Sequence, residues 1–249
     1  GSTVGSAAVT TIDVSEITSN GADIITDTGN GNVDTTPTTS LDITGSDQDD
    51  VIGLGTSDDT ITTGAGSDDI IFNDFANQDD GKFTVKDFDA STGSGDDDVI
   101  DIDADAPGEF TTADGTTVDL QGTRGTKDAV AGDFFSSDNV NLTVASGSYD
   151  PTAHVIVEIQ DSVTTTNLDG DFTAGNFHTD FDGSLDFGGT NDTFKGAVAV
   201  NSGDDVGLFY VDTSVASDTA MTLENGDTVA LIGVLENAGA DNLEADNFI

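Results

Sequence analysis

Apolar and polar residues follow two different patterns along this chain of 249 residues. In the first half, acidic residues precede a short apolar pair and glycine separates the copies, as in residues 45–71, GSDQDDVIGLGTSDDTITTGAGSDDII. Asp49, Asp58 and Asp68 mark the three copies, with a step of nine residues and then one of ten. Short apolar runs between glycine-rich breaks predict brief β-strands joined by tight turns.

The second half instead alternates apolar and polar residues over short runs. Residues 139–145 (NVNLTVA) and 153–159 (AHVIVEI) show the pattern, and the runs GAVAV, GLFYV and DTVALIGVL follow them. Such runs between Gly, Asn and Asp predict an antiparallel β-sandwich. Helical signals are few, with a short helix expected over 127–135 and a turn over 242–246. The predicted fold class is therefore all-β.

These patterns divide the chain into three predicted regions. Residues 1–40 form an N-terminal extension or strand, with a strand expected at Ile12–Ile17 and a degenerate copy of the repeat at Asn20–Thr26. Residues 41–105 carry the regular acidic repeat, and residues 106–249 carry the sandwich. No apolar run approaches the ~18 residues of a membrane span, so we expect no direct insertion into a membrane.

The charge of the chain limits its partners. Asp and Glu number 49 against five Lys and Arg, which gives a formal net charge of −44. So few cations cannot neutralise phosphates, which excludes nucleic-acid binding. Apolar residues make up 35% of the chain and glycine adds 30 residues, enough for a folded core. A compact chain with this much negative charge therefore needs a neutralising partner, and divalent cations are the expected one.

The acidic repeat has the chemistry of a calcium site. Ca²⁺ takes about six to eight oxygen ligands from carboxylates, carbonyls and water, and glycine allows a turn to direct its carbonyls inward. Because the aspartates are doubled, either member of a pair can be the ligand. The predicted metal-site residues are Gly45, Asp47, Asp49, Asp50, Gly55, Asp58, Asp59, Gly64, Gly66, Asp68, Asp69, Asp96, Asp97, Asp98 and Asp101.

At Gly64, Gly66, Asp68 and Ile70 the sequence resembles the nonapeptide G-G-x-G-x-D-x-U-x of the repeats-in-toxin family. Residues 85–103 resemble the segment that closes such repeats, and residues 227–249 resemble the C-terminal region of type I secretion substrates. The resemblance implies a short calcium-binding parallel β-roll-like segment, here joined to the sandwich. It also implies export in one step and folding outside the cell on meeting Ca²⁺, hence an extracellular location.

No catalytic constellation is visible, and we expect no enzymatic activity. Of the two histidines, His154 is expected in a strand and His178 in a surface loop. The favoured hypothesis is a secreted structural protein that assembles with itself through calcium-bridged contacts into a surface layer or filament. Calcium can also bridge it to cell-surface polysaccharide. A calcium-stabilised secreted hydrolase and an adhesin module remain alternatives, and acidic residues that only solvate the surface are the simplest competing interpretation.

Overall fold

The computed structural model describes the part of the chain that carries most of the secondary structure. The described residues are 11–13, 23–26, 40, 42–53, 58–72, 82–90, 97–102, 110–118, 134–142, 145, 149–160, 163, 165–168, 171–189, 193–215, 222–239 and 243–248. For residues 11–13, 23–26, 72, 102, 117–118 and 215, only the backbone is described. The described residues are mainly β, and their strands form one mixed sheet of 11 strands and one parallel sheet of four.

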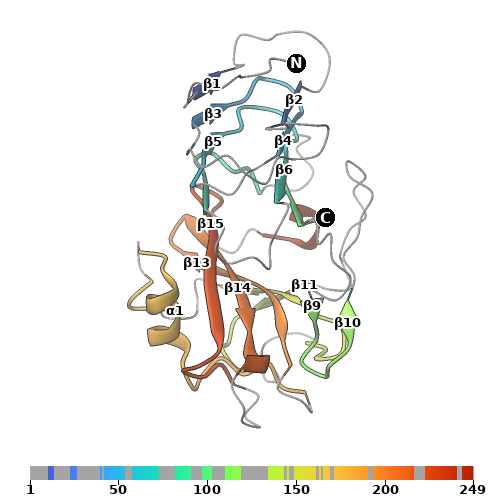
Figure 1. Cartoon of the computed structure of the whole chain (residues 1–249), viewed down its shortest axis with the longest axis vertical. Helices are drawn as coiled ribbons and strands as arrows, with labels where there is room; N and C mark the ends of the chain where they lie inside the picture. The colour runs from blue at the N-terminus through green and yellow to red at the C-terminus, as the bar shows by residue number, and fades with distance from the viewer. Residues whose placement is uncertain are drawn as a thin grey trace.

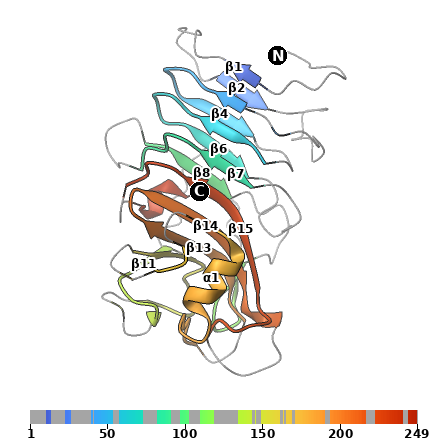
Figure 2. The same ribbon diagram turned by 90° about the vertical axis from the view of Figure 1, so that its left-hand side faces the viewer.

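Eight short strands in the N-terminal half alternate between these two sheets. The mixed sheet contains β1 (Thr11–Asp13), β3 (Asp42–Thr44), β5 (Thr60–Thr62) and β7 (Phe83–Val85). The parallel sheet contains β2 (Asp23–Thr26), β4 (Asp50–Gly53), β6 (Asp69–Phe72) and β8 (Val99–Ile102). The chain therefore winds between two stacks of parallel strands, and we call β1–β8 the coil (Figure 2).

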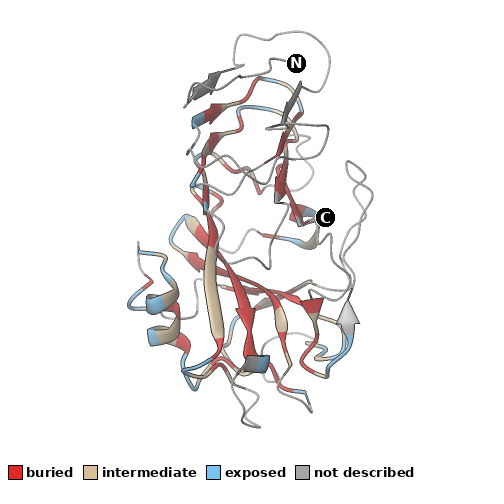
Figure 3. Cartoon of the chain, in the orientation of Figure 1, coloured by how far each residue is buried: buried red, intermediate tan, exposed pale blue. Residues whose placement is uncertain are grey.

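The repeat of the sequence sets the pitch of the coil. Ile43 pairs with Ile61 on one side and Ile52 pairs with Ile70 on the other, so in β3–β6 each strand meets the strand 18 positions later. Two copies of the nine-residue repeat thus make one full turn. The other pairs of the coil are separated by longer insertions, as between Ile61 and Val85 or Ile70 and Ile100. Ile43, Ile52, Ile61 and Ile70 are at most 3% exposed and belong to one buried hydrophobic cluster. Figure 3 marks buried residues in red along the strands of both stacks.

The remaining strands extend the mixed sheet away from the coil (Figure 1). In spatial order β7 is followed by β15 (Thr228–Leu235), β14 (Asp205–Asp212), β13 (Lys195–Ser202), β12 (Ile156–Ile159) and β11 (Phe134–Ser137). The short strands β9 (Phe110–Thr111) and β10 (Thr117–Val118) attach to β13 through β9.

The expected antiparallel pairing is confirmed for β13, β14 and β15, and for β9, which pairs antiparallel with β10 and β13. Strand β12 pairs parallel with both β11 and β13, and β15 pairs parallel with β7. All described strands of residues 106–249 lie in this one sheet, so the second sheet of a sandwich stays a prediction. Residues 139–145 form no strand where they are described, and only a single bridge joins Asn141 to Asp186.

Helix α1 (Ala174–Phe181) covers one face of the mixed sheet. The hydroxyl of its N-cap Thr173 accepts a hydrogen bond from the backbone N–H of Asn176, and Phe177 and Phe181 are buried. The ring centroid of Phe177 lies 4.6 Å from that of Phe209 on β14. Because the helix begins at Ala174, the prediction that His178 lies in a loop is wrong.

The other helical predictions have mixed outcomes. Of the helix expected over 127–135, residues 127–133 lie outside the described residues, while Phe134 and Phe135 belong to β11, so the prediction is wrong at that end. The turn expected over 242–246 is confirmed at its C-terminal end, where the 3₁₀ helix η3 (Ala245–Asn247) begins, while residue 242 lies outside the described residues. A second 3₁₀ helix, η2, spans Thr213–Val215. No helix among the described residues is long and apolar enough to cross a membrane.

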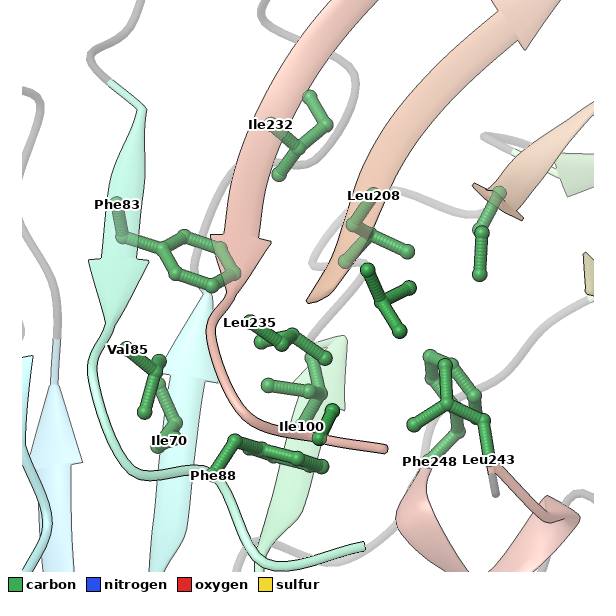
Figure 4. Packing of buried hydrophobic residues seen from close by; sticks show 14 of the residues in the cluster. Ile70, Phe83, Val85, Phe88, Ile100, Leu208, Ile232, Leu235, Leu243 and Phe248 are labelled. Atoms are coloured by element: carbon green, nitrogen blue, oxygen red, sulfur yellow. The ribbon is translucent and has the colours of Figure 1, made fainter. Parts of the chain in front are cut away.

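The coil and the mixed sheet share one hydrophobic core. Figure 4 shows side chains of the coil, including Phe88 and Ile100, packed beside Leu235 from β15 and Phe248 from the end of the chain. Phe248 also forms a parallel bridge with Ile100 of β8, at the edge of the parallel sheet. The core therefore crosses the predicted boundary between residues 105 and 106, and the C-terminal segment closes this end of the coil.

Candidate metal-binding turns of the coil

The turns that lead from the mixed sheet to the parallel sheet stack on one another along one side of the coil. We call them the aspartate turns; their described residues are 45–49, 63–68, 86–90 and 97–98. The backbone N–H of Gly45 donates to the carbonyl of Thr62 at 2.8 Å, and that of Ala65 donates to the carbonyl of Ser46 at 3.1 Å. Successive turns are therefore in direct backbone contact.

Glycine makes this close approach possible. A Cβ added at Gly45 would lie 1.9 Å from the carbonyl oxygen of Thr63, well inside van der Waals contact. Gly66 has a φ of 127° and approaches the backbone of Gln48, so any other residue there is strained and crowded. The glycine spacing of the repeat is thus required by the stacking of the turns.

Three buried aspartates form a ladder along the start of the parallel sheet. The backbone N–H of Asp50 donates to Oδ1 of Asp68 at 2.7 Å, and the N–H of Asp68 donates to Oδ1 of Asp98 at 3.2 Å. All three residues are 1–2% exposed. We call Asp50, Asp68 and Asp98 the aspartate ladder. The carboxylates of Asp68 and Asp98 each accept an N–H group from the preceding turn of the coil, whereas that of Asp50 accepts the N–H of Ser46 in its own turn.

Other carboxylates join the aspartate turns in the same way. Oδ1 and Oδ2 of Asp87 accept from the backbone N–H groups of Thr63 and Gly64, at 2.8 and 3.2 Å. Asp49 accepts from the N–H of Ser67 at 3.1 Å. Carboxylates that accept backbone N–H groups are strong, charge-assisted hydrogen-bond partners. Much of the acidic repeat therefore holds neighbouring turns together directly.

One carboxylate oxygen of Asp68 takes part in none of these hydrogen bonds. Its Oδ2 is buried and has no hydrogen-bond partner. Burial, together with the charges of Asp98, Asp50 and Asp49, raises the pKa of Asp68 to about 8. The hydrogen bond from the N–H of Asp50 lowers this pKa, but by less than burial raises it. Burial likewise raises the pKa of Asp98 to about 7. The ladder thus holds negative charge at a cost that a proton or a cation in contact with Asp68 would remove.

Some of the predicted metal-site residues lie close together in the structure, and the others lie elsewhere. Eight of the predicted residues lie together in the aspartate turns and the ladder: Gly45, Asp49, Asp50, Gly64, Gly66, Asp68, Asp97 and Asp98. Asp47 is exposed in the first of these turns.

The other predicted residues lie elsewhere. Asp58 and Asp59 precede β5 on the opposite side of the coil, where Asp58 accepts from the N–H of Lys82 at 3.0 Å. Asp69 and Asp101 lie on β6 and β8, in register with Val99 and Ile71. They occupy the face of the parallel sheet opposite the buried Ile70 and Ile100. Gly55 and Asp96 lie outside the described residues.

Sequence reasoning missed Asp87 and the polar residues Ser46 and Thr63. The side chain and N–H of Ser46 both donate to Asp50, at 3.2 and 2.6 Å. The Thr63 hydroxyl donates to Asp98 Oδ2 at 3.2 Å and also to Asp87. Their signal is positional, because all three directly follow strands of the mixed sheet: Thr63 comes one residue after β5, and Ser46 and Asp87 come two residues after β3 and β7.

The donor chemistry of the aspartate turns fits a hard cation. In the described part of the chain, no group of three or more His, Asp or Glu side chains converges on one point. The available donors are nevertheless all oxygens, from carboxylates and from glycine-turn carbonyls, which is the set that Ca²⁺ prefers. The buried, unpartnered Oδ2 of Asp68 is the atom that such an ion would satisfy.

The two histidines belong to other surroundings. Nδ1 of His154 accepts from the N–H of Asp150 at 2.9 Å, and the ring stacks on Phe135 with centroids 5.3 Å apart. Burial lowers the pKa of His154. It precedes β12 instead of lying within the expected strand. His178 lies on helix α1.

Comparisons of the chain with protein-family models, with curated proteins and with solved structures found no match. The geometry of the aspartate turns therefore carries the functional argument.

Proposed function

We propose that this protein is a secreted, calcium-binding structural protein whose coil is stabilised by Ca²⁺ at the aspartate turns. The observation that carries the proposal is the buried Oδ2 of Asp68, an anionic oxygen without a partner between stacked glycine turns. A carboxylate this buried is costly unless a proton or a cation neutralises it. In a chain with five Lys and Arg, a divalent ion is the better source of positive charge.

The residues suited to hold the ion come from adjacent turns of the coil. Asp68 would contribute Oδ2, and Asp49 and Asp98 would contribute carboxylate oxygens beside the bonds that they already accept. Carbonyls of the glycine turns and water would complete the oxygen set. When bound, Ca²⁺ supplies positive charge that offsets the repulsion between these carboxylates. The ion would therefore strengthen contacts that the turns already make.

The same ion would control association between copies. Asp47, Asp49 and Asp58 are exposed on the coil, and the whole chain carries a formal charge of −44. Two such surfaces repel each other unless a divalent cation lies between them. Calcium-bridged contacts would convert this repulsion into adhesion, and repetition of the contact would produce an extracellular layer or filament. Weak sites of ~10⁻⁴–10⁻³ M suffice in the calcium-rich medium outside cells.

The test combines calcium counting with electron microscopy of the full chain. Isothermal titration with CaCl₂ should show bound Ca²⁺ in the wild type and at least one ion fewer in Asp68→Asn. Asp114→Asn serves as the control because Asp114 lies outside the coil. Microscopy should show ordered polymers with Ca²⁺ that disperse in chelator. Polymers that persist unchanged in chelator, or a chain that takes up no Ca²⁺, would refute the proposal.

A further inference from the structure

Strand β15 has a neighbour on both sides along its second half only. The strand pairs with β14 over almost its whole length, whereas only residues 233–235 also pair with β7 of the coil. In the described part of the chain, residues 228–232 therefore form a margin of the mixed sheet, where β15 continues beyond the coil (Figure 2). We call residues 228–232 the β15 margin.

The hydrogen bonding of the sheet shows which backbone groups point out of this margin. The N–H of Thr213 donates to the carbonyl of Phe194 at 2.9 Å, so these opposite residues at the ends of β14 and β13 form a hydrogen-bonded pair. Hydrogen-bonded and non-hydrogen-bonded pairs alternate along an antiparallel ladder, which directs the N–H and C=O of Ala230 toward β14. The same groups of Val229 and Leu231 point away from β14, and no hydrogen bond joins them to a described residue.

The margin is also apolar and partly exposed. Residues 228–231 are all partly exposed. Val229 and Leu231 pack against one hydrophobic cluster, and Ala230 packs against the other on the opposite face. Sheet edges are usually protected by lysine, by proline or by a very short strand, and an edge that lacks such protection can pair with another strand. The β15 margin contains neither lysine nor proline.

The charged residues that adjoin the margin are held by other groups. Asp212 is opposite Thr228 on β14 and forms an ion pair with Lys195 at 3.0 Å. Asp227 precedes the margin and is buried. At the other end, Lys82 precedes β7, and its backbone N–H donates to the carboxylate of Asp58. The margin itself, from residue 228 to residue 232, contains no charge.

A second copy of the chain has what this margin requires of a partner. Two chains with a formal charge of −44 each repel one another wherever carboxylates meet, so the contact has to be an uncharged strand with an open edge. The β15 margin of a second copy is such a strand. Its length also sets the register, because β7 occupies the edge from Gly233 onward and a turn ends at Asp227. An antiparallel strand fits between these limits when Ala230 of one copy lies opposite Ala230 of the other.

We propose that two copies of this protein pair along the β15 margin and form a two-fold symmetric dimer. In this register Val229 of each copy lies opposite Leu231 of the other, and their outward N–H and C=O groups form about four hydrogen bonds across the axis. The side chains of each such pair lie on one face and cover each other. The contact requires no metal and lies away from the aspartate turns. It therefore goes beyond the calcium-bridged assembly proposed above.

The test is sedimentation equilibrium of the full chain in chelator and about 0.5 M NaCl, which screens the repulsion between the copies. We expect wild type to show monomers and dimers in exchange. Val229→Pro removes one outward N–H and keeps the bonds to β14, since proline is tolerated at sheet edges. Its dimer should dissociate at least about tenfold more readily. The matched control, Val229→Thr, keeps the N–H and the shape of the side chain and should form dimers as wild type does.

Hydrogen exchange of wild type gives a second readout that depends on no substitution. As the protein concentration rises, the amides of Val229 and Leu231 should become protected. The amide of Ala230 already donates to β14 and should not change with concentration. This readout decides the matter if Val229→Pro melts well below wild type.

Four outcomes would overturn the inference. They are a wild type that stays monomeric, dimers in which the amides of Val229 and Leu231 stay unprotected, a folded Val229→Pro that forms dimers as wild type does, and open polymers in chelator, which indicate head-to-tail pairing with another margin such as β11. Addition of CaCl₂ to the same samples separates this inference from the proposed function. Dimers in chelator without any uptake of Ca²⁺ would leave the inference standing and refute the proposed function. Calcium-dependent polymers of a chain that is monomeric in chelator would do the reverse.

Discussion

The carboxylates of the aspartate turns can accept backbone hydrogen bonds or bind a cation, and the sequence alone does not tell which of them does which. As acceptors of backbone N–H groups, Asp68 and Asp98 fix one turn of the coil to the next, and Asp50 closes its own turn. The short side chain of aspartate suits this role because it reaches only the neighbouring backbone. The oxygen left over on Asp68 is then the part of the ladder open to a cation. A single residue type thus serves both the fold and the candidate site.

Asp68→Asn should therefore act in opposite directions with and without metal. The asparagine can still accept from the N–H of Asp50, and it replaces the unpartnered anionic oxygen with a neutral amide. In chelator at pH 8 we expect unfolding to cost about 1–3 kcal/mol more than in wild type. In Ca²⁺ we expect the stabilisation by metal to shrink. Calorimetry in both buffers measures this, and a variant destabilised equally in both would contradict the role assigned to Asp68.

The ladder also makes the metal-free protein sensitive to alkaline pH. The pKa values of Asp68 and Asp98 are raised to about 8 and about 7 in the folded state, from 3.8. Folding therefore favours their protonated forms, and this contribution is complete below pH 3.8 and lost as the pH rises toward 8. In chelator we expect the melting temperature to fall between pH 5 and pH 9. Asp68→Asn/Asp98→Asn should flatten that slope; an equally steep slope would count against the ladder as its source.

The stacked turns should tolerate no side chain at Gly45. An alanine there would force its Cβ against the carbonyl of Thr63 and toward Asp50. We expect Gly45→Ala to lower stability by about 2 kcal/mol or more, measured by urea unfolding. Gly175→Ala in helix α1 is the control, because nothing lies within 4 Å of its added Cβ. That change should raise stability by up to about 1 kcal/mol. Similar effects of the two substitutions would show that the turns are not closely packed.

At the scale of residues, the sequence predicts which residue types gather but not their individual roles. The doubled aspartates leave open which member is buried, and the answer depends on where each strand starts. Asp50 and Asp68 precede the inward isoleucines by two residues and join the ladder, whereas Asp69 is one residue away and lies on the opposite face. That assignment needs the register, which pairing between turns sets.

At the scale of elements, the nine-residue period over residues 45–71 predicts β4, β5 and β6 because each copy has an apolar stretch and a glycine break. The alternation in residues 153–159 likewise predicts β12. Helix α1 had no comparable signal. Its residues Gly175, Asn176 and Thr179 are poor helix formers, and the helix is stabilised by burial of Phe177 and Phe181 on the sheet. Such tertiary packing leaves no local pattern in the sequence.

The C-terminal segment should be required for the coil as well as for the mixed sheet. Phe248 is fully buried, stacks on Phe134 at 5.7 Å between centroids and bridges to Ile100 of β8. We expect Phe248→Ala to cost about 3–5 kcal/mol and to lower the hydrogen-exchange protection of β4, β6 and β8. Phe177→Ala, in the other hydrophobic cluster, should loosen α1 and leave these coil amides protected. Unchanged protection of the coil in Phe248→Ala would contradict the shared core.

At the scale of the whole molecule, one of the two hydrophobic clusters joins a highly acidic coil to the rest of the mixed sheet. The mixed sheet runs without interruption from β1 through β7 and β15 to β11, and the core contains residues from both halves. Stress at the aspartate turns is therefore expected to affect the entire chain, since the coil cannot open without exposing Leu235 and Phe248. Repulsion between the carboxylates of the aspartate turns is therefore expected to lower the free energy of unfolding of the whole chain.

The most direct test of the account is the melting temperature of the full chain in low salt, after removal of all divalent ions and again after addition of CaCl₂. Circular dichroism records the β signal in both samples. The account predicts that Ca²⁺ raises the melting temperature by at least about 5 °C, which corresponds to roughly 2 kcal/mol for a chain of this size. An unaltered melting temperature and an undiminished β signal without metal would contradict it.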